Sequence, residues 1–179
     1  MVTIFHWDEP TWFSDSGGFT RASSVDRFTR YARIVIDRFC DRVTKWITIN
    51  EPMVYASKGY LLGDFPPGRK VDLRGYFRVT HHQLLAHART VEAGKSIAPK
   101  SEFGVAQAQI RLLPDREGDQ RDIAAADRMD ALLNRLFVDP LIHGSYPRVI
   151  KHLYQKRLPA GWERDLESMH STPDFIGLN

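Results

Sequence analysis

Four short apolar runs occur along the chain, and each of them ends at polar residues. The runs are rich in β-branched and aromatic residues, a pattern that predicts four β-strands. The predicted strands cover residues 2–5, 46–49, 103–106 and 174–179.

Longer segments with helical periodicity separate these strands. The residues Val25, Phe28, Ala32, Val35 and Phe39 recur at spacings of three and four and form one apolar stripe. They predict a helix from a capping box at 23–26 to about residue 43. Further helices are expected at about 73–97, 123–138 and 146–157, and loops at 65–68 and 114–122.

The alternation of strands and helices predicts a parallel α/β arrangement. Each predicted strand ends in polar residues, and in a (β/α)8 barrel the active site is built at the C-terminal ends of the strands. The pattern therefore favours part of such a barrel over an open doubly wound sheet. A dinucleotide-binding site is disfavoured, because no G-x-G-x-x-G motif follows any of the strands.

The composition is that of a globular protein, since 42% of the 179 residues are hydrophobic and 26% are charged. The formal net charge is +3, but basic and acidic residues alternate, as they do between Asp26 and Arg42. Such alternation is typical of a solvated helix face, so we expect no nucleic-acid partner.

Cys40 is the only cysteine, which excludes an intramolecular disulfide and fits a reducing compartment. Its position in a helical apolar pattern predicts a buried structural thiol. No apolar run approaches the roughly 18 residues of a membrane span, and residues 1–6 resemble a strand rather than a signal peptide. The expectation is a cytoplasmic protein without a membrane partner.

Glu51 is the first candidate for catalysis, because it follows directly on the second predicted strand. Hydrolysis of a glycosidic bond needs an acid that protonates the leaving oxygen and a second carboxylate that attacks the sugar or activates water. Burial beside Trp7 or Trp46 would keep Glu51 protonated near neutral pH. Pro52 is expected to hold Glu51 in an extended conformation. The ordinary alternative is a glutamate before a proline in a surface turn.

Three further residues offer contacts to a sugar. Asn50 can hold a hydroxyl, although a regular strand would place it on the face opposite to Glu51. Both face a substrate only if regular pairing has ended by Asn50. Trp7 offers an aromatic face to the C–H side of a pyranose, and His6 offers an imidazole to its hydroxyls. Taken alone, His6 and Trp7 are more simply a satisfied histidine and a core tryptophan.

Three histidines, His81, His82 and His87, lie on the helix predicted at 73–97. They lack an H-E-x-x-H motif or comparable ligand spacing. We therefore expect packing residues here and no metal site.

The order and spacing of these segments resemble glycoside hydrolase family 1 from end to end of the chain. The matching segments are Ile4-Phe5-His6-Trp7-Asp8, Gly17-Gly18-Phe19, Asp41-Arg42-Val43, Trp46-Ile47-Thr48-Ile49-Asn50-Glu51-Pro52, Gly59-Tyr60, Pro66-Pro67-Gly68, the helix around His81 to His87, Asp139-Pro140-Leu141, Gly144-Ser145-Tyr146-Pro147 and Asp174-Phe175-Ile176-Gly177-Leu178-Asn179. Each motif is modest by itself, but the set is very specific.

The resemblance implies a (β/α)8 barrel that hydrolyses β-glucosides or β-galactosides with retention and without a cofactor. It assigns Glu51 as the acid/base and Asn50 as the contact to the sugar 2-hydroxyl. It places His6 and Trp7 in the glycone site and Asn179 near the end of the sixth strand. The partner that it implies is a small-molecule β-glycoside or oligosaccharide.

The sequence also departs from the family pattern. Glu9 stands where the family usually has leucine and adds a charge near the mouth of the site. The chain resembles only the third to sixth strands, so residues 1–179 are expected to form a single incomplete (β/α)8 domain of about four βα units. The Glu-Asn-Gly motif that carries the family's nucleophile is missing.

Two alternatives to a complete retaining enzyme stay open. Asp8 could act with Glu51 in inverting hydrolysis, which needs a carboxyl separation of roughly 6.5–9.5 Å. The chain could instead be a catalytically inactive truncated half-barrel that only binds sugar or associates with itself through open sheet edges.

Overall fold

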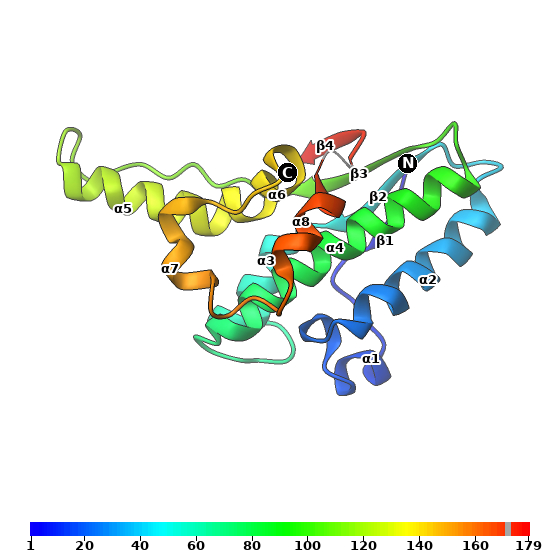
Figure 1. Cartoon of the computed structure of the whole chain (residues 1–179), viewed down its shortest axis with the longest axis horizontal. Helices are drawn as coiled ribbons and strands as arrows, with labels where there is room; N and C mark the ends of the chain where they lie inside the picture. Colours follow the sequence, from blue (N-terminus) through cyan, green and yellow to red (C-terminus); the bar gives the residue numbers. More distant parts are fainter. Residues whose placement is uncertain (171–172) are drawn as a thin grey trace.

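The computed structural model describes residues 1–170 and 173–179 (Figure 1). Its strands are β1 (Val2–Phe5), β2 (Lys45–Asn50), β3 (Glu102–Gln107) and β4 (Phe175–Leu178). Its α-helices are α1 (Thr11–Asp15), α2 (Ser23–Phe39), α3 (Pro52–Ala56), α4 (Leu73–Ile97), α5 (Gln120–Asp130), α6 (Leu136–His143), α7 (Lys151–Tyr154) and α8 (Trp162–Met169). The 3-10 turns η1 (Gly18–Thr20) and η4 (Arg148–Ile150) and the π-helical turns η2 (Ser57–Leu62) and η3 (Ala131–Arg135) complete the elements.

The four strands form one parallel sheet in the order β1-β2-β3-β4. This confirms the predicted parallel α/β arrangement. Because neighbouring strands run in the same direction, their C-terminal ends lie at one edge of the sheet. The pairing of β2 with β3 is irregular between Ile47 and Asn50, just before that edge.

Helices α2 and α4 lie side by side along one face of the sheet (Figure 1). The buried stripe of α2 follows the prediction as far as Ala32 and then continues through Ile36, whereas Phe39 is exposed. Between the helices and the sheet, the Trp46 ring stacks on the Phe103 ring. The ring centroids are 6.5 Å apart, and the angle between the ring planes is 9°. Apolar side chains packed at helical spacing thus attach both helices to the sheet.

Two glycines allow these layers to approach closely. A Cβ atom at Gly94 of α4 would lie 2.5 Å from the Phe103 ring, and one at Gly104 of β3 would collide with the Phe175 carbonyl oxygen. A larger residue would push α4 from the sheet or β4 from β3. Gly104 therefore helps to hold β4, the strand that leads to Asn179.

Helix α2 begins at Ser23, as predicted, but its capping and its end differ from the prediction. The helix ends at Phe39 rather than near Val43. The predicted capping box is wrong, since no side chain caps the helix and the Ser24 hydroxyl donates to the Gly18 carbonyl oxygen at 2.5 Å. The reason is that Ala22 already has helical torsion angles, so η1 leads almost directly into the helix.

Other helices differ in extent. The helix expected at 123–138 is a continuous succession of α5, η3 and α6 over 120–143. The helix expected at 146–157 is reduced to the short η4 and α7. The helices α1, α3 and α8 were not predicted, because each has at most eight residues and too few apolar positions to show a period.

The three histidines of α4 are packing residues, as predicted. His81 Nδ1 lies 3.0 Å from the Tyr146 hydroxyl, and its Nε2 lies 2.9 Å from Asp165 of α8. His82 donates through Nδ1 to the Phe19 carbonyl oxygen at 2.7 Å. His87 Nδ1 lies 2.7 Å from the Thr48 hydroxyl of β2. Each histidine thus joins α4 to a different part of the fold.

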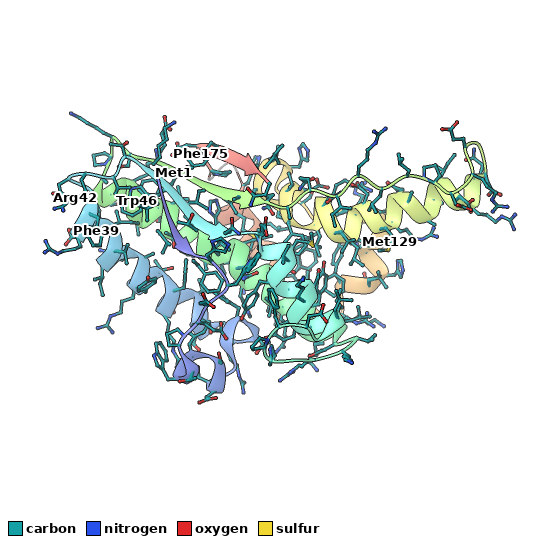
Figure 2. All side chains as sticks on the ribbon, turned by 180° about the vertical axis from the view of Figure 1, so that it is seen from behind. Met1, Phe39, Arg42, Trp46, Met129 and Phe175 are labelled. Carbon is teal, nitrogen blue, oxygen red and sulfur yellow. The ribbon has the colours of Figure 1, made fainter. Side chains whose placement is uncertain are left out.

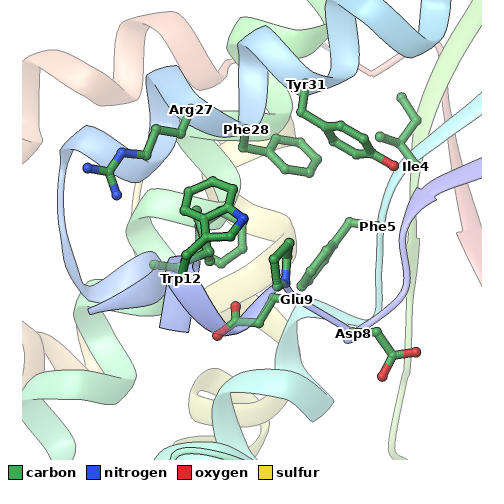
Figure 3. Close-up of a pocket in the computed structure, with 11 residues that line it drawn as sticks. Ile4, Phe5, Asp8, Glu9, Trp12, Arg27, Phe28 and Tyr31 are labelled. Atoms are coloured by element: carbon green, nitrogen blue, oxygen red, sulfur yellow. The ribbon is translucent and has the colours of Figure 1, made fainter. Parts of the chain in front are cut away.

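Both outer strands leave an edge of the sheet open, since β1 pairs only with β2 and β4 only with β3 in the described residues. Met1 and Val2 of the first edge and Leu178 of the last are exposed. Figure 2 shows Met1 and Phe175 near these two edges. An apolar cavity of 420 Å³ adjoins β1 and is lined by Ile4, Phe5, Asp8, Glu9, Pro10, Trp12, Phe13, Phe19, Arg27, Phe28 and Tyr31 (Figure 3).

Two further sequence-based expectations concern the thiol and the membrane. Cys40 is half-buried rather than buried, because it follows the last residue of α2; its Sγ lies 3.6 Å from the Asp37 carbonyl oxygen. Within 1–170 and 173–179, no helix has the length and apolar character needed to cross a membrane.

Candidate active site

Glu51 lies at the junction between β2 and α3. Its backbone has φ 45° and ψ 61°, a left-handed conformation that is uncommon for a residue other than glycine. The extended conformation predicted from Pro52 is therefore wrong. The Glu51 N–H donates to the Ala106 carbonyl oxygen at 2.8 Å, which holds this turn against β3.

Asn50 is buried and Glu51 is half-buried. Regular pairing is interrupted before Asn50, and the left-handed turn follows it, so strict alternation does not apply to the two side chains. Regular pairing has thus ended by Asn50, which is the condition under which both side chains can face one site. A strained backbone of this kind is frequent at functional sites, where the surrounding structure maintains it.

Asn179 brings the end of β4 to these two residues. Its backbone N–H donates to the Gln107 carbonyl oxygen at 3.0 Å. Its side-chain amide donates to Glu51 Oε1 at 2.7 Å and to Asn50 Oδ1 at 3.3 Å. Asn179 thus meets two residues that precede it by 129 and 128 positions in the chain, at the end of the sheet where the C-termini of the strands lie.

His6 and Trp7 follow the C-terminal end of β1. They lie at the same end of the sheet as Asn50 and Glu51, because Phe5 pairs with Ile49. Trp7 also has a positive φ, of 73°, and its ring lies edge-on to the His6 ring at 4.9 Å. His6 is exposed, whereas Trp7 is half-buried and packs against the hydrophobic core. The indole N–H of Trp7 is buried and has no protein partner among the described residues.

Glu9 does not present a free charge at this edge. Its carboxylate accepts a hydrogen bond from the Ser14 hydroxyl at 2.5 Å and another from the Tyr55 hydroxyl at 2.8 Å. Burial and, secondly, the negative charge of Glu9 raise the pKa of Tyr55 and raise that of Tyr60 to about 12. Both phenols therefore stay protonated at physiological pH, and Tyr55 remains a donor to Glu9.

Two other features lie apart from Glu51. Trp46, one of the two tryptophans expected beside it, lies near the start of β2 and stacks on Phe103. The cavity of 420 Å³ is not lined by Asn50, Glu51 or Asn179. It lies between the end of β1 and α2, and the cluster of Asn50, Glu51 and Asn179 is separate from it.

The loop 63–72, which includes the loop expected at 65–68, is a further part of this region. Its backbone N–H groups bond to four carbonyl oxygens of η2, in the pairs Phe65–Lys58, Arg69–Gly59, Val71–Leu61 and Asp72–Tyr60. It holds the Phe65 ring 5.4 Å from the Trp7 ring. The Pro66-Pro67-Gly68 segment indicated a loop, but no pattern in the sequence indicated this contact.

The whole chain, residues 1–179, matches the family model for glycosyl hydrolase family 1. The chain belongs to glycosyl hydrolase family 1. The match and the resemblance noted in the sequence agree over the same residues.

Curated relatives of this family 1 chain include β-glucosidase A of Thermotoga maritima, which is 35% identical over 180 residues. Another is β-glucosidase 12 of Oryza sativa subsp. japonica, 35% identical over 194 residues. Both matches cover 100% of this chain but only 40% and 38% of the relatives. The chain thus spans about two fifths of the length of these enzymes.

The fold of the family 1 chain agrees with solved structures. The β-glucosidase from Thermotoga maritima in complex with glucoimidazole superposes with a TM-score of 0.94 at 34% identity, over 100% of this chain and 40% of the other. The same enzyme has been solved with isofagomine lactam, with a TM-score of 0.93. The four parallel strands and their helices match part of the TIM barrel of the family, as the sequence predicted.

The same described residues, 1–170 and 173–179, contain no group of three or more histidine, cysteine, aspartate or glutamate side chains placed to hold a metal ion. The strand ends carry the carboxyl group of Glu51, the amides of Asn50 and Asn179, the imidazole of His6 and the indole of Trp7. These are groups that bind sugars and transfer protons.

Proposed function

We propose that this chain supplies the proton-donor side of a retaining β-glycosidase active site, with Glu51 as the acid/base. One observation supports this assignment above the others. The side-chain amide of Asn179 donates to Glu51 Oε1 and Asn50 Oδ1, so three strand-end residues form one cluster. The names of the relatives, β-glucosidases, support β-glucosides as the substrate class.

The contacts of Glu51 suggest how its proton is placed. Because an N–H donor occupies Oε1, the proton of the neutral acid is directed to Oε2. In the proposed mechanism Glu51 delivers this proton to the glycosidic oxygen and, as the carboxylate, later accepts a proton from water. Asn179 orients the carboxyl group throughout.

Asn50, His6 and Trp7 are proposed to bind the sugar. The Asn50 amide is proposed to hold the 2-hydroxyl, a contact that strengthens as positive charge develops on the sugar ring. His6 offers its exposed imidazole, and the unpartnered indole N–H of Trp7 offers a donor. These roles follow the family resemblance position by position.

Retention needs a nucleophilic carboxylate at about 5–5.5 Å from the acid/base, across the sugar. The family's motif for it is absent from these 179 residues. We propose that in the active protein this group comes from a segment outside the chain. We prefer this over inverting hydrolysis with Asp8, because Asp8 corresponds to the glycone side of the site.

The test is a panel of nitrophenyl glycosides, assayed with this chain and with a version extended at both ends to the length of its relatives. We expect the extended protein to hydrolyse β-glucosides or β-galactosides with retention and to leave α-glucosides intact. The 179-residue chain alone should release nitrophenol no faster than buffer, because it lacks the nucleophile. Inversion, or turnover of α-glucosides only, would contradict the proposal.

A second candidate function is self-association of an inactive half-barrel. The two open sheet edges and the apolar cavity beside β1 favour it, since unpaired edges and exposed apolar grooves promote contacts between chains. Trp12 and Tyr31 line the cavity and are more than half exposed.

Sedimentation measures this association directly. The isolated chain is expected to form dimers or larger species at micromolar concentration. Replacement of Tyr31 by serine should shift the distribution of oligomeric species toward the monomer. The same change at the buried Tyr154 serves only as a control for loss of folding. A chain that stays monomeric at all concentrations would exclude this function.

A further inference from the structure

Three aromatic rings form a row that leaves the strand ends and finishes at a positive charge. The His6 and Trp7 rings are 4.9 Å apart, and the Trp7 and Phe65 rings are 5.4 Å apart. The Lys58 ammonium lies 5.0 Å from the centre of the Phe65 ring. The row thus connects the proposed sugar-binding residues to a cation on η2.

Phe65 is held in place by its backbone. Its N–H donates to the Lys58 carbonyl oxygen at 3.2 Å, and its own carbonyl oxygen accepts from the Gly68 N–H at 2.8 Å. The rest of the loop is bonded to η2 as described above. A ring fixed in this way loses little entropy when a ligand packs against it.

The Lys58 ammonium is available to an anion. It forms no ion pair with any carboxylate in the part of the chain that the structure describes. Its one contact of note is the face of Phe65, an interaction that leaves N–H donors free. The side chain is half-buried, which strengthens its attraction for a negative group compared with a fully solvated lysine.

Lys58 lies on the helical segment that begins directly after Glu51. It follows Glu51 by seven positions through α3 and η2, which at about 1.5 Å per residue is roughly 10 Å along the helix axis. The proton donor contacts the glycosidic oxygen, so the group attached to that oxygen extends past Glu51. An aromatic ring with a substituent has the size to reach from Glu51 toward Lys58.

We propose that this site prefers β-glycosides whose leaving group is an aromatic ring bearing a carboxylate. The ring packs against Trp7 and Phe65, and the carboxylate pairs with the Lys58 ammonium. This inference rests on the proposed function, because it assumes that Glu51 and the sugar-binding residues act as described.

The test compares the binding of 4-carboxyphenyl β-D-glucoside and its neutral 4-carbamoylphenyl analogue to the 179-residue chain by calorimetry. We expect the carboxylate to bind about two- to fivefold more tightly, the size of effect for a partly exposed ion pair. Lys58→Met should abolish the preference while retaining the apolar stem of the side chain. Lys70→Met, in the loop 63–72 that packs against η2, removes an exposed lysine as a matched control and should leave the preference intact.

Equal affinity for the two glucosides, or a preference that survives in Lys58→Met, would overturn the inference and leave the proposed function standing. Binding of free 4-hydroxybenzoate, which carries the carboxylate but no sugar, tests the anion site independently of the sugar site. If it binds in a Lys58-dependent manner while neither glucoside binds, Lys58 holds a carboxylate but the 179-residue chain does not hold the sugar, and the inferred preference among glucosides is overturned. If none of the three ligands binds, the anion site fails, and the proposed function is decided separately by the glycoside panel on the extended protein.

Discussion

Glu51→Gln is expected to lower kcat/KM for phenyl β-glucosides roughly 10²- to 10⁴-fold in the extended protein, the usual contribution of a general acid. Glutamine still accepts the hydrogen bond from the Asn179 amide, so the site is expected to keep its geometry. It has no proton to give to the leaving oxygen. The measurement is the initial rate of hydrolysis at several substrate concentrations.

A second substrate identifies the step that is lost. Dinitrophenolate leaves readily without protonation, so the first step with a dinitrophenyl glucoside should be much less affected than that with a phenyl glucoside. Glu102→Gln is the matched control: Glu102 lies at the opposite end of the sheet, where it pairs with Lys45 at 2.7 Å. An equal loss in both variants, or no loss in Glu51→Gln, would sink the assignment of Glu51.

The chain is expected to lose about 4 kcal/mol of stability between pH 7 and pH 5, about 2 kcal/mol for each of two histidines. Burial lowers the pKa of His82 and that of His87 to about 4, compared with an ordinary value of 6.5. Below pH 6.5 these two histidines therefore become protonated in the unfolded chain, whereas in the folded chain they stay neutral until the pH approaches about 4. Stability falls as the pH decreases through this window, and a loss of this size is a large share of a typical total.

Urea unfolding at a series of pH values measures this loss. The slope of stability against pH between 7 and 5 should fall by about half in His87→Gln, whatever the stability of that variant at pH 7. His152→Gln removes an exposed histidine of α7 and should leave the slope unchanged. A flat profile in the parent chain would show that the buried histidines do not control acid unfolding.

The strands and the longest helix were predictable because their signals are local. β-Branched and aromatic runs that end at polar residues gave the positions of all four strands within one or two residues. The helix expected at about 73–97 is α4, with the observed limits. The π-helical turn of η2 was not predictable, because its departure from α-helical spacing is imposed by the loop 63–72, whose N–H groups take up its carbonyl oxygens.

The candidate site was predictable to the extent that it follows from the ends of parallel strands. Asn50, Glu51 and Asn179 each follow or end a strand, and parallel order brings such residues to one edge. The torsion angles of Glu51 were not predictable, since the usual influence of a following proline favours the opposite conformation. The contact between Trp7 and Phe65 is likewise a tertiary one that joins β1 to a loop more than fifty positions away.

The left-handed backbone conformation at Glu51 places the stability of the chain in opposition to its proposed activity. Side chains with a Cβ atom cost roughly 1–2 kcal/mol in that conformation, whereas glycine adopts it freely. A selection for heat resistance alone would thus favour glycine there and discard the carboxyl group. The proposed role of Glu51 as proton donor would account for a glutamate at this turn, where its carboxyl group is gained at the expense of a more stable backbone.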